Sequence, residues 1–140
     1  MAYEMNDPVL LKTKGIETNI IRFRDYGVDF YADTLFTTED MIKNHPDVVK
    51  KFVKASFRGW DYAIKNLTEA VEEVLKVNPN LNREAQLGYL QSSIPIINKD
   101  ERLGISNKDV WESMQKELLI QKIMKESIDV DKSFTNDFLK

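Results

Sequence analysis

The side chains that most often carry catalysis or bind metals are scarce in this sequence. Its 140 residues include one histidine, His45, and no cysteine. Thiolate nucleophiles, disulfides, cysteine-based metal centres and sites with two histidine ligands are therefore excluded. His45 lacks evident partners and precedes Pro46, so we interpret it as a helix-start residue at the surface. Acid/base chemistry would depend on carboxylates, tyrosines and lysines, and no carboxylate pair has an evident catalytic spacing. We expect no catalytic residue, no metal site, no cofactor and no turnover.

Two tryptophans could suggest an aromatic ligand box. Trp60 and Trp111 each stand on an apolar stripe with helical spacing, however, and this pattern is more typical of core packing. The lysines between residues 43 and 54 and the acidic run Glu69, Glu72 and Glu73 are typical of solvated helix faces. We therefore expect the tryptophans inside and these charges outside.

The overall composition narrows the class of partner. With 20 Lys and Arg against 23 Asp and Glu, the net charge is −3, so nucleic acid is not an expected partner. The longest apolar runs, such as residues 9–11 and 118–120, are far shorter than the roughly 20 residues of a membrane span. The first eight residues contain neither the basic segment nor the apolar segment with which a secretory signal peptide begins. The length fits one domain.

The first third of the chain predicts extended structure. Residues 18–23 are rich in β-branched and aromatic side chains, and they lie between Gly15 and a turn at residues 25–27. Two shorter segments, residues 28–31 and 34–36, follow with no room for a helix between them. Before them, Pro8 can open a short helix that runs to about Lys14 and ends at Gly15. We expect three short strands after one short helix.

From Thr37 onward the pattern is helical. A capping box at residues 37–40 predicts a short helix to about Asn44, and Pro46 opens a long helix to about residue 65. Its apolar residues share one face, which we expect to be core, and Gly59 within it indicates a tight contact. Two further helices are expected, from Thr68 to Asn78 and from Asn82 to a stop at Pro95. Another helix should follow a capping box at residues 106–109. The C-terminal tail is expected to form a turn and a short helix that docks through Phe134, Phe138 and Leu139.

Three short strands need a larger sheet to complete them. The pattern as a whole therefore indicates a helix-rich α/β piece, and by itself it names no function.

Four motifs in the sequence are distinctive. They are Asn6-Asp7-Pro8, the run Tyr-Gly-Val-Asp-Phe-Tyr-Ala-Asp at residues 26–33, Leu35-Phe36-Thr37, and Ala-Ser-Phe-Arg-Gly-Trp-Asp-Tyr-Ala at residues 55–63. Together they resemble the NMT1/THI5-like family of two-lobed solute-binding proteins. The resemblance extends in order along nearly the whole chain. It implies the helix-rich portion of a type II periplasmic-binding-protein-like fold. The family domain is about twice as long, so residues 1–140 are expected to be a partial domain that lacks the N-terminal part of the first lobe.

The resemblance also implies a ligand site. Asn6 and Asp7 would lie at one edge of the cleft between the lobes, and Tyr31 and Asp33 where the chain crosses back to the first lobe. There a carboxylate could accept a hydrogen bond from an amino group or a protonated ring nitrogen, and Tyr31 could stack on a planar ligand. Local roles in turns, caps or a half-buried strand are equally compatible with these residue types. Asp7 replaces the family's glutamate and Ala32 a glycine.

The same resemblance suggests partners and alternatives. The ligand would be a small molecule, such as a thiamine-precursor pyrimidine or a sulfonate, and the partner an ABC permease or a fused signalling output region. The full-length protein would be bacterial and periplasmic or otherwise extracytoplasmic. Unpaired strand edges could also drive homodimerisation. A helical interaction module without a ligand is the main alternative, and a thiamine-pyrimidine biosynthesis enzyme is a weaker one because no matching histidine-rich element is present.

Overall fold

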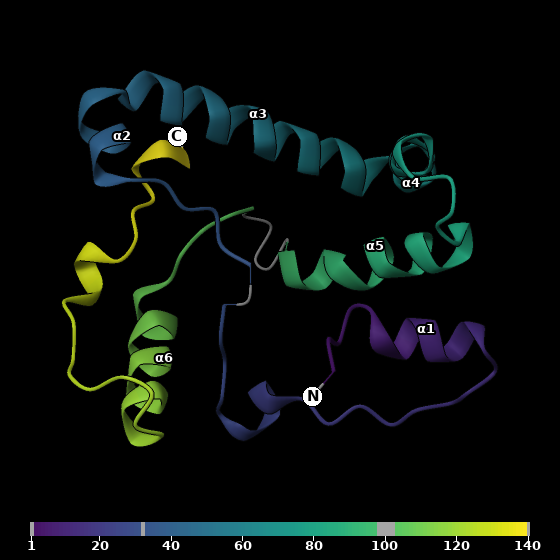
Figure 1. The fold of residues 1–140 in the computed structure, drawn as a ribbon, viewed down its shortest axis with the longest axis horizontal. Coiled ribbons are helices and arrows are strands. Elements are labelled where there is room, and N and C mark those ends of the chain that lie inside the picture. Colours follow the sequence, from purple (N-terminus) through teal and green to yellow (C-terminus); the bar gives the residue numbers. More distant parts are fainter. Residues whose placement is uncertain (1, 32, 98–102, 140) are drawn as a thin grey trace. The chain divides into compact units, whose positions relative to one another are not determined.

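The computed structural model describes residues 2–31, 33–97 and 103–139. The chain divides into two compact units, of which the first comprises Met1–Ile20 and Ala55–Gly104 and the second Ile21–Lys54 and Ile105–Lys140. Figure 1 labels the helices of both units.

Four helices are seen in the described residues of the first unit. They are α1 (Asp7–Thr13), the C-terminal part of α3 (Pro46–Lys65), α4 (Leu67–Val77) and α5 (Arg83–Ile97). The helix predicted after Pro8 is confirmed, and it ends before Gly15, whose φ of 74° is the left-handed conformation that glycine adopts at low cost. The helix predicted after Asn82 is confirmed as well, because the Asn82 side chain accepts a hydrogen bond from the Ala85 amide at 2.8 Å.

The core of the first unit lies along α5, which contacts both α4 and α1. Val71 of α4 and Ala85 of α5 are each only 3% exposed. Gly88 allows α1 to approach closely, since a Cβ atom at this position would lie 2.5 Å from Cγ1 of Val9. A glycine within the helix therefore marks the contact between α1 and α5.

The long helix predicted for residues 46–65 is confirmed as α3, but its apolar stripe is only partly core. Val49 and Val53 are buried, whereas Phe52 is 58% exposed and Trp60 is 46% exposed. The prediction that Trp60 is core is therefore wrong. The tight contact predicted at Gly59 is also absent among the described residues, because no atom outside the local helix backbone lies within 4 Å of a Cβ built there. Helical periodicity identifies the side chains that favour burial, but it does not supply a surface to cover them.

The second unit consists mainly of α2 (Glu39–Asn44), the start of α3, and α6 (Lys108–Ile120). Three short 3-10 helices join them: η1 (Phe23–Tyr26), η3 (Val130–Lys132) and η4 (Asp137–Leu139). The docking predicted for the tail is confirmed, since η3 packs on α6 and Val130 is 7% exposed. Phe134, Phe138 and Leu139 are all partly buried.

The three predicted strands are not formed within the described residues. Residues 18–22 have no regular structure, Phe23 begins η1, and the described parts of residues 28–36 have no regular structure either. A strand needs hydrogen bonds from a neighbouring strand, and none of the amides of residues 17–21 donates to a described backbone carbonyl. The expected α/β character is thus not seen in the part of the chain that the structure describes.

Several predicted helix boundaries also change. Pro95 does not stop α5, which continues to Ile97. The N-cap of α2 is Thr38, whose hydroxyl accepts from the Met41 amide at 3.2 Å, and α4 begins after Asn66 instead of at Thr68. The capping box predicted at residues 106–109 is not formed, because the N-cap of α6 is Asn107 instead of Ser106 and the Asn107 side chain makes no capping hydrogen bond. Boundary residues of similar propensity compete, and tertiary packing decides between them.

Candidate functional site

Asn6 and Asp7 stand at the N-terminus of α1. Asn6 is exposed, and its side chain makes no capping hydrogen bond. The Asp7 carboxylate accepts a hydrogen bond from the Tyr3 backbone amide at 2.6 Å. A carboxylate in the first helical turn also interacts favourably with the positive end of the helix dipole. Asp7 therefore holds residues 3–7 as a turn, and its part in ligand binding stays a prediction.

Tyr31 belongs to the second unit, and both its side-chain hydroxyl and its backbone amide are hydrogen-bonded. Its hydroxyl accepts a hydrogen bond from the Asn107 backbone amide at 2.8 Å, while its own backbone amide donates to the sulfur of Met114 at 3.4 Å. Asn107 is the N-cap of α6, so the phenol oxygen is an acceptor placed at the start of that helix. These contacts fix Tyr31 against α6.

An aromatic cluster forms where Tyr31 meets α6. The ring centroids of Tyr31 and Trp111 are 5.5 Å apart with planes tilted by 48°, and those of Trp111 and Phe134 are 6.0 Å apart with nearly parallel planes. Centroid separations in this range are favourable for aromatic pairs. We name Tyr31, Trp111 and Phe134 the aromatic cluster. It joins three segments that are far apart in the sequence.

The indole of Trp111 carries a polar group that the described residues leave unsatisfied. Its Nε1 atom is buried, and no described group accepts its hydrogen. A buried donor without an acceptor costs about 1–3 kcal/mol, so such groups are uncommon in finished protein interiors. The Trp111 residue as a whole is partly buried.

Asp33 is exposed, and its carboxylate accepts no hydrogen bond from a described residue. It lies two residues after Tyr31 in the second unit, whereas Asn6 and Asp7 lie in the first unit. The four predicted site residues therefore form two pairs, one in each unit.

The C-terminal tail is hydrogen-bonded to the residues at the start of α6, next to the aromatic cluster. The Asn136 side chain pairs with the backbone of Ser106, accepting from its amide at 3.0 Å and donating to its carbonyl at 2.9 Å. Lys108 donates to the carboxylate of Asp131 at 2.6 Å, and this hydrogen bond raises the pKa of Lys108 above its usual value. These hydrogen bonds hold the tail in the position in which Phe134 contacts Trp111.

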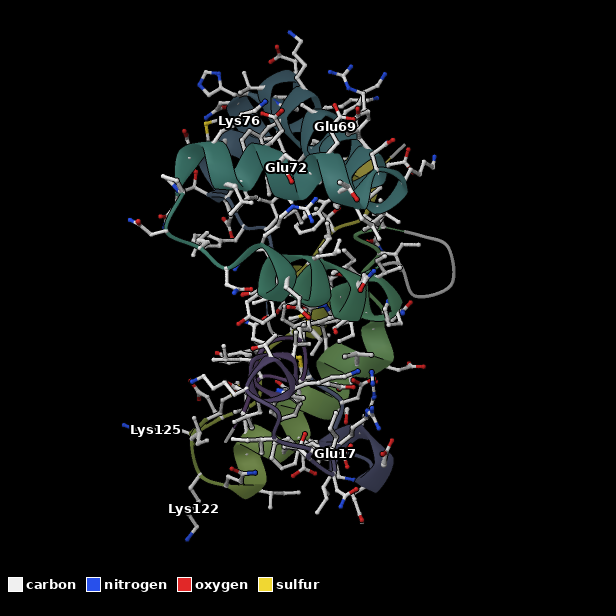
Figure 2. All side chains as sticks on the ribbon, turned by 90° about the vertical axis from the view of Figure 1, so that its right-hand side faces the viewer. Glu17, Glu69, Glu72, Lys76, Lys122 and Lys125 are labelled. Atoms are coloured by element: carbon white, nitrogen blue, oxygen red, sulfur yellow. The ribbon has the colours of Figure 1, made fainter. Side chains whose placement is uncertain are left out.

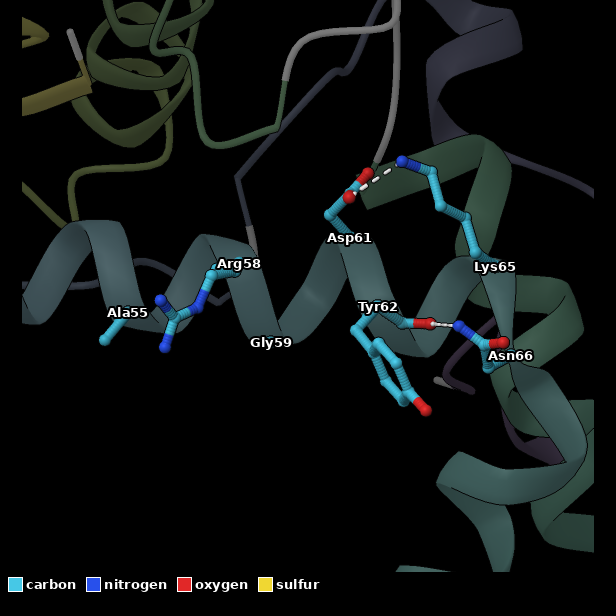
Figure 3. Close-up of a pocket in the computed structure, with 7 residues that line it drawn as sticks. All are labelled: Ala55, Arg58, Gly59, Asp61, Tyr62, Lys65 and Asn66. Atoms are coloured by element: carbon cyan, nitrogen blue, oxygen red, sulfur yellow. Dashed lines mark hydrogen bonds and ion pairs between the residues drawn. The ribbon is translucent and has the colours of Figure 1, made fainter.

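A surface hollow on α3 in the first unit is a weaker candidate. It is lined by Ala55, Arg58, Gly59, Asp61, Tyr62, Lys65 and Asn66. Figure 3 shows that Asp61 and Lys65, paired at 2.8 Å, point to one side of the helix while Tyr62 points to another. The Tyr62 hydroxyl donates to Glu69 at 2.8 Å, which raises the pKa of this tyrosine. All of these lining residues belong to the C-terminal half of α3 or directly follow it, so the hollow has no opposite wall that would enclose a ligand.

The charged side chains of α4 remain at the surface, as predicted. Figure 2 shows Glu69, Glu72 and Lys76 along this helix. Glu72 accepts from Arg83 at 2.6 Å, and this exposed pair links α4 to α5. Such exposed ion pairs contribute little to stability.

Neither a metal site nor a membrane-spanning helix is found among the described residues. No group of three or more His, Asp or Glu side chains there could hold a metal ion. None of the described helices is long and apolar enough to cross a membrane.

Sequence reasoning missed most neighbours of Tyr31. Asn107 follows it by 76 positions and Met114 by 83, and no local pattern signals contacts over such separations. Trp111 was predicted to be a packing residue, and the structure makes it the centre of the aromatic cluster. Its partly buried indole with a free N–H could not be inferred from helical spacing alone.

Comparisons with known proteins agree with the motifs. The family model described as NMT1/THI5 like matches residues 1–70. The riboflavin-binding protein RibY of Chloroflexus aurantiacus is 30% identical to the chain over 150 aligned residues. The alignment covers 99% of this chain and 41% of RibY, so the chain spans less than half of that relative's length.

Proposed function

The chain belongs to the NMT1/THI5-like family, and we propose that it is part of a solute-binding domain that binds a small planar heteroaromatic molecule without turning it over. Members of this family have a periplasmic-binding-protein-like fold. In such a fold the ligand lies in a cleft between lobes, among apolar and aromatic side chains with a few polar groups. We propose that residues 1–140 supply one part of that cleft.

The aromatic cluster is the observation that carries this proposal. Tyr31 comes from the motif at residues 26–33, and its ring lies beside Trp111. The two rings lie within one small region together with a buried indole N–H for which no described residue supplies an acceptor, and we propose that the complete cleft brings a ligand to these groups. A flavin or pyrimidine ring presents both a flat face and acceptor atoms, so it matches this chemistry.

The acidic candidates favour such a ring over a sulfonate. Asp7 and Asp33 are carboxylates, which accept hydrogen bonds from ring N–H or amino groups but repel an anionic sulfonate. RibY is described as a riboflavin-binding protein, so riboflavin is the first ligand to test. A thiamine-precursor pyrimidine is the second.

The proposed partners follow from the same assignment. A solute-binding domain delivers its ligand to an ABC permease or controls a fused signalling region, and it works outside the cytoplasm. We propose one of these two contexts for this chain. A matching permease gene or output region next to its coding sequence would support the proposal.

The test is a titration of riboflavin, whose own fluorescence reports binding. It uses this chain together with the part of RibY that lies outside the 41% covered by the alignment, which we call the complementing polypeptide. We expect saturable 1:1 binding. Replacing Tyr31 by alanine should weaken it about tenfold, because an aromatic pair contributes about 0.5–1.5 kcal/mol beyond its buried area. Replacing Asp7 by asparagine should also weaken it.

Tyr26 provides the matched control. It is 76% exposed and lies outside the aromatic cluster, so Tyr26→Ala should leave the affinity unchanged. Equal loss in both tyrosine variants, or preferential binding of an alkane sulfonate, would contradict the proposal. An unchanged affinity in Tyr31→Ala would place the site elsewhere.

A further inference from the structure

After α6 the chain turns back along the helix in a short loop. The Ile123 amide donates a hydrogen bond to the Leu118 carbonyl at 2.9 Å, which closes the end of the helix. Further along, the Ile128 amide donates to the side chain of Gln115 at 2.6 Å. These hydrogen bonds tie both arms of the turn to α6. We name residues 120–128 the isoleucine-lysine loop.

Three isoleucines of this loop face the solvent. Ile120, Ile123 and Ile128 are 61%, 67% and 54% exposed. Isoleucine is among the residue types that are most often buried, so three exposed isoleucines in one short segment are unusual for an ordinary surface. All three belong to the second unit. The loop therefore presents apolar side chains that the described residues do not cover.

Two lysines stand between these isoleucines. Lys122 and Lys125 are exposed, and neither forms an ion pair with a described carboxylate. Figure 2 shows their side chains extending outward from the loop. Two lysines against one glutamate, Glu126, give residues 120–128 a net charge of +1, whereas the whole chain carries −3. The loop is thus a positive segment of an acidic protein.

Lys122 also has an uncommon backbone conformation. Its φ of 58° lies in the left-handed region, where the other described residues with positive φ are all glycines. A side chain at such a position costs stability that glycine would avoid, so a lysine there suggests a use for the side chain. A cation near the C-terminal end of α6 interacts favourably with the helix dipole, but this does not explain the exposed isoleucines beside it.

We propose that the isoleucine-lysine loop docks on the surface of an anionic lipid bilayer. The isoleucine side chains enter the boundary between the headgroups and the acyl chains, and the two lysines contact the negative headgroups. Apolar side chains interleaved with lysines are the combination that favours such a position. This inference goes beyond solute binding and does not depend on the ligand.

A lipid surface fits this loop better than a protein partner. A stable protein interface takes about 20–30 residues from each side, which is far more than the loop offers. A bilayer needs no complementary shape, and a few apolar side chains with nearby cations can hold a protein there reversibly. A second copy of the chain would bring the same positive loop, and like charges repel each other. Size and charge therefore favour anionic lipid.

The test measures binding of the chain to vesicles with no riboflavin present. Vesicles of phosphatidylcholine and phosphatidylglycerol in equal parts are compared with vesicles of phosphatidylcholine alone. We expect the chain to sediment with the anionic vesicles and to be released at high salt, which screens the lysines.

A dye reports whether the loop itself meets the lipid. The chain has no cysteine, so Ile123→Cys gives a unique site for a polarity-sensitive fluorescent dye. Its emission should shift to shorter wavelength on anionic vesicles. Val77→Cys is the matched control, because Val77 is an apolar residue of α4 that is 88% exposed, and the dye placed there should not shift.

Charge variants test the two lysines. Replacing Lys122 and Lys125 together by glutamine should weaken binding to anionic vesicles about thirtyfold, since each lysine near such a surface contributes about fivefold. The same change at Lys50 and Lys54, an exposed and unpaired set on α3, is the matched control. Lys122→Gly should weaken binding about fivefold and yet raise Tm, because glycine adopts the left-handed conformation at low cost. A purely structural role of Lys122 would not separate these two effects.

Serine variants test the isoleucines. Ile120→Ser combined with Ile123→Ser should weaken vesicle binding at least tenfold, because the apolar insertion is lost. Leu35→Ser combined with Phe36→Ser is the matched control, since these residues are 57% and 90% exposed and lie outside the loop. This control should bind vesicles as the unchanged chain does, which excludes general adhesion of exposed apolar surface.

Three results would each overturn the proposal. They are equal binding to both kinds of vesicle, an unchanged dye emission at Ile123→Cys, and equal losses in the loop variants and their controls. Loss of vesicle binding on addition of the complementing polypeptide would also overturn it, because the loop would then be covered inside the domain. If the complex binds anionic vesicles but no riboflavin, the lipid-docking loop stands and the proposed function fails.

Discussion

Tyr31 offers the sharpest test of the structure of the second unit. Its hydroxyl accepts the Asn107 amide at 2.8 Å, and its ring lies 5.5 Å from that of Trp111. Tyr31→Phe removes only the acceptor and should cost about 0.5–1.5 kcal/mol, the usual net contribution of such a hydrogen bond. Tyr31→Ala also removes the aromatic contact and part of the packing, and its total cost should reach about 3 kcal/mol.

The assay is thermal unfolding combined with tryptophan fluorescence. For a chain of this size, 1 kcal/mol corresponds to a shift of about 3–5 °C in Tm. Tyr31→Phe should thus lower Tm by several degrees, and Tyr31→Ala by about twice as much or more. Trp60 is replaced by phenylalanine in every sample, so that the fluorescence comes from Trp111. Tyr26→Phe and Tyr26→Ala, at a tyrosine that is 76% exposed, are the matched controls. Equal shifts at both tyrosines, or an unchanged Trp111 emission in Tyr31→Ala, would refute the described contacts.

Three further outcomes are expected. Asn136→Ala removes both hydrogen bonds to Ser106 and should lower stability by about 1–3 kcal/mol, as measured by urea unfolding, whereas Thr135→Ala should have less effect. The pKa of Lys108 is raised by its hydrogen bond to Asp131. This pair should therefore stabilise the tail below pH 10.5 and lose its effect as the pH rises through the higher folded-state pKa. If the stability of Lys108→Gln, measured over the same pH range, falls in the same way as that of the unchanged chain, this expectation is contradicted. Gly88→Ala should destabilise by about 1–3 kcal/mol because Val9 occupies the space of the new methyl group, and Val9→Ala should relieve the effect. Gly59→Ala, where no atom outside the local helix backbone lies within 4 Å, should instead stabilise α3 by up to about 1 kcal/mol. A stabilising Gly88→Ala together with a destabilising Gly59→Ala would show that the helix contacts are misassigned.

Local signals predicted the helices well because their causes are local. Pro46, the Asn78-Pro79 stop and the Asn82 cap each act within one turn of the chain, and α3, α4 and α5 begin or end at or near them. The strands failed for the opposite reason. Residues 18–23 have the composition of a strand, but a strand forms only with a partner, and the described residues provide none.

The candidate site shows the same limit. Sequence motifs selected Asn6, Asp7, Tyr31 and Asp33, and the structure adds local roles for two of them, a turn at Asp7 and a contact with α6 at Tyr31. No sequence signal placed Trp111 and Phe134 beside Tyr31, because that contact depends on packing between distant segments. The burial predicted for Trp60 was wrong because the described chain has no surface that covers it.

The most direct test of solute binding uses the two tryptophan side chains as reporters in a ¹⁵N-labelled chain. Each indole N–H gives one resolved NMR signal, and riboflavin is titrated into the labelled chain bound to the complementing polypeptide. The indole signal of Trp111, whose buried Nε1 has no described acceptor, should shift and saturate, while that of Trp60 stays in place as an internal control. If neither indole signal moves, or if only the Trp60 signal moves, the aromatic cluster is not part of a ligand site and the proposed function is wrong.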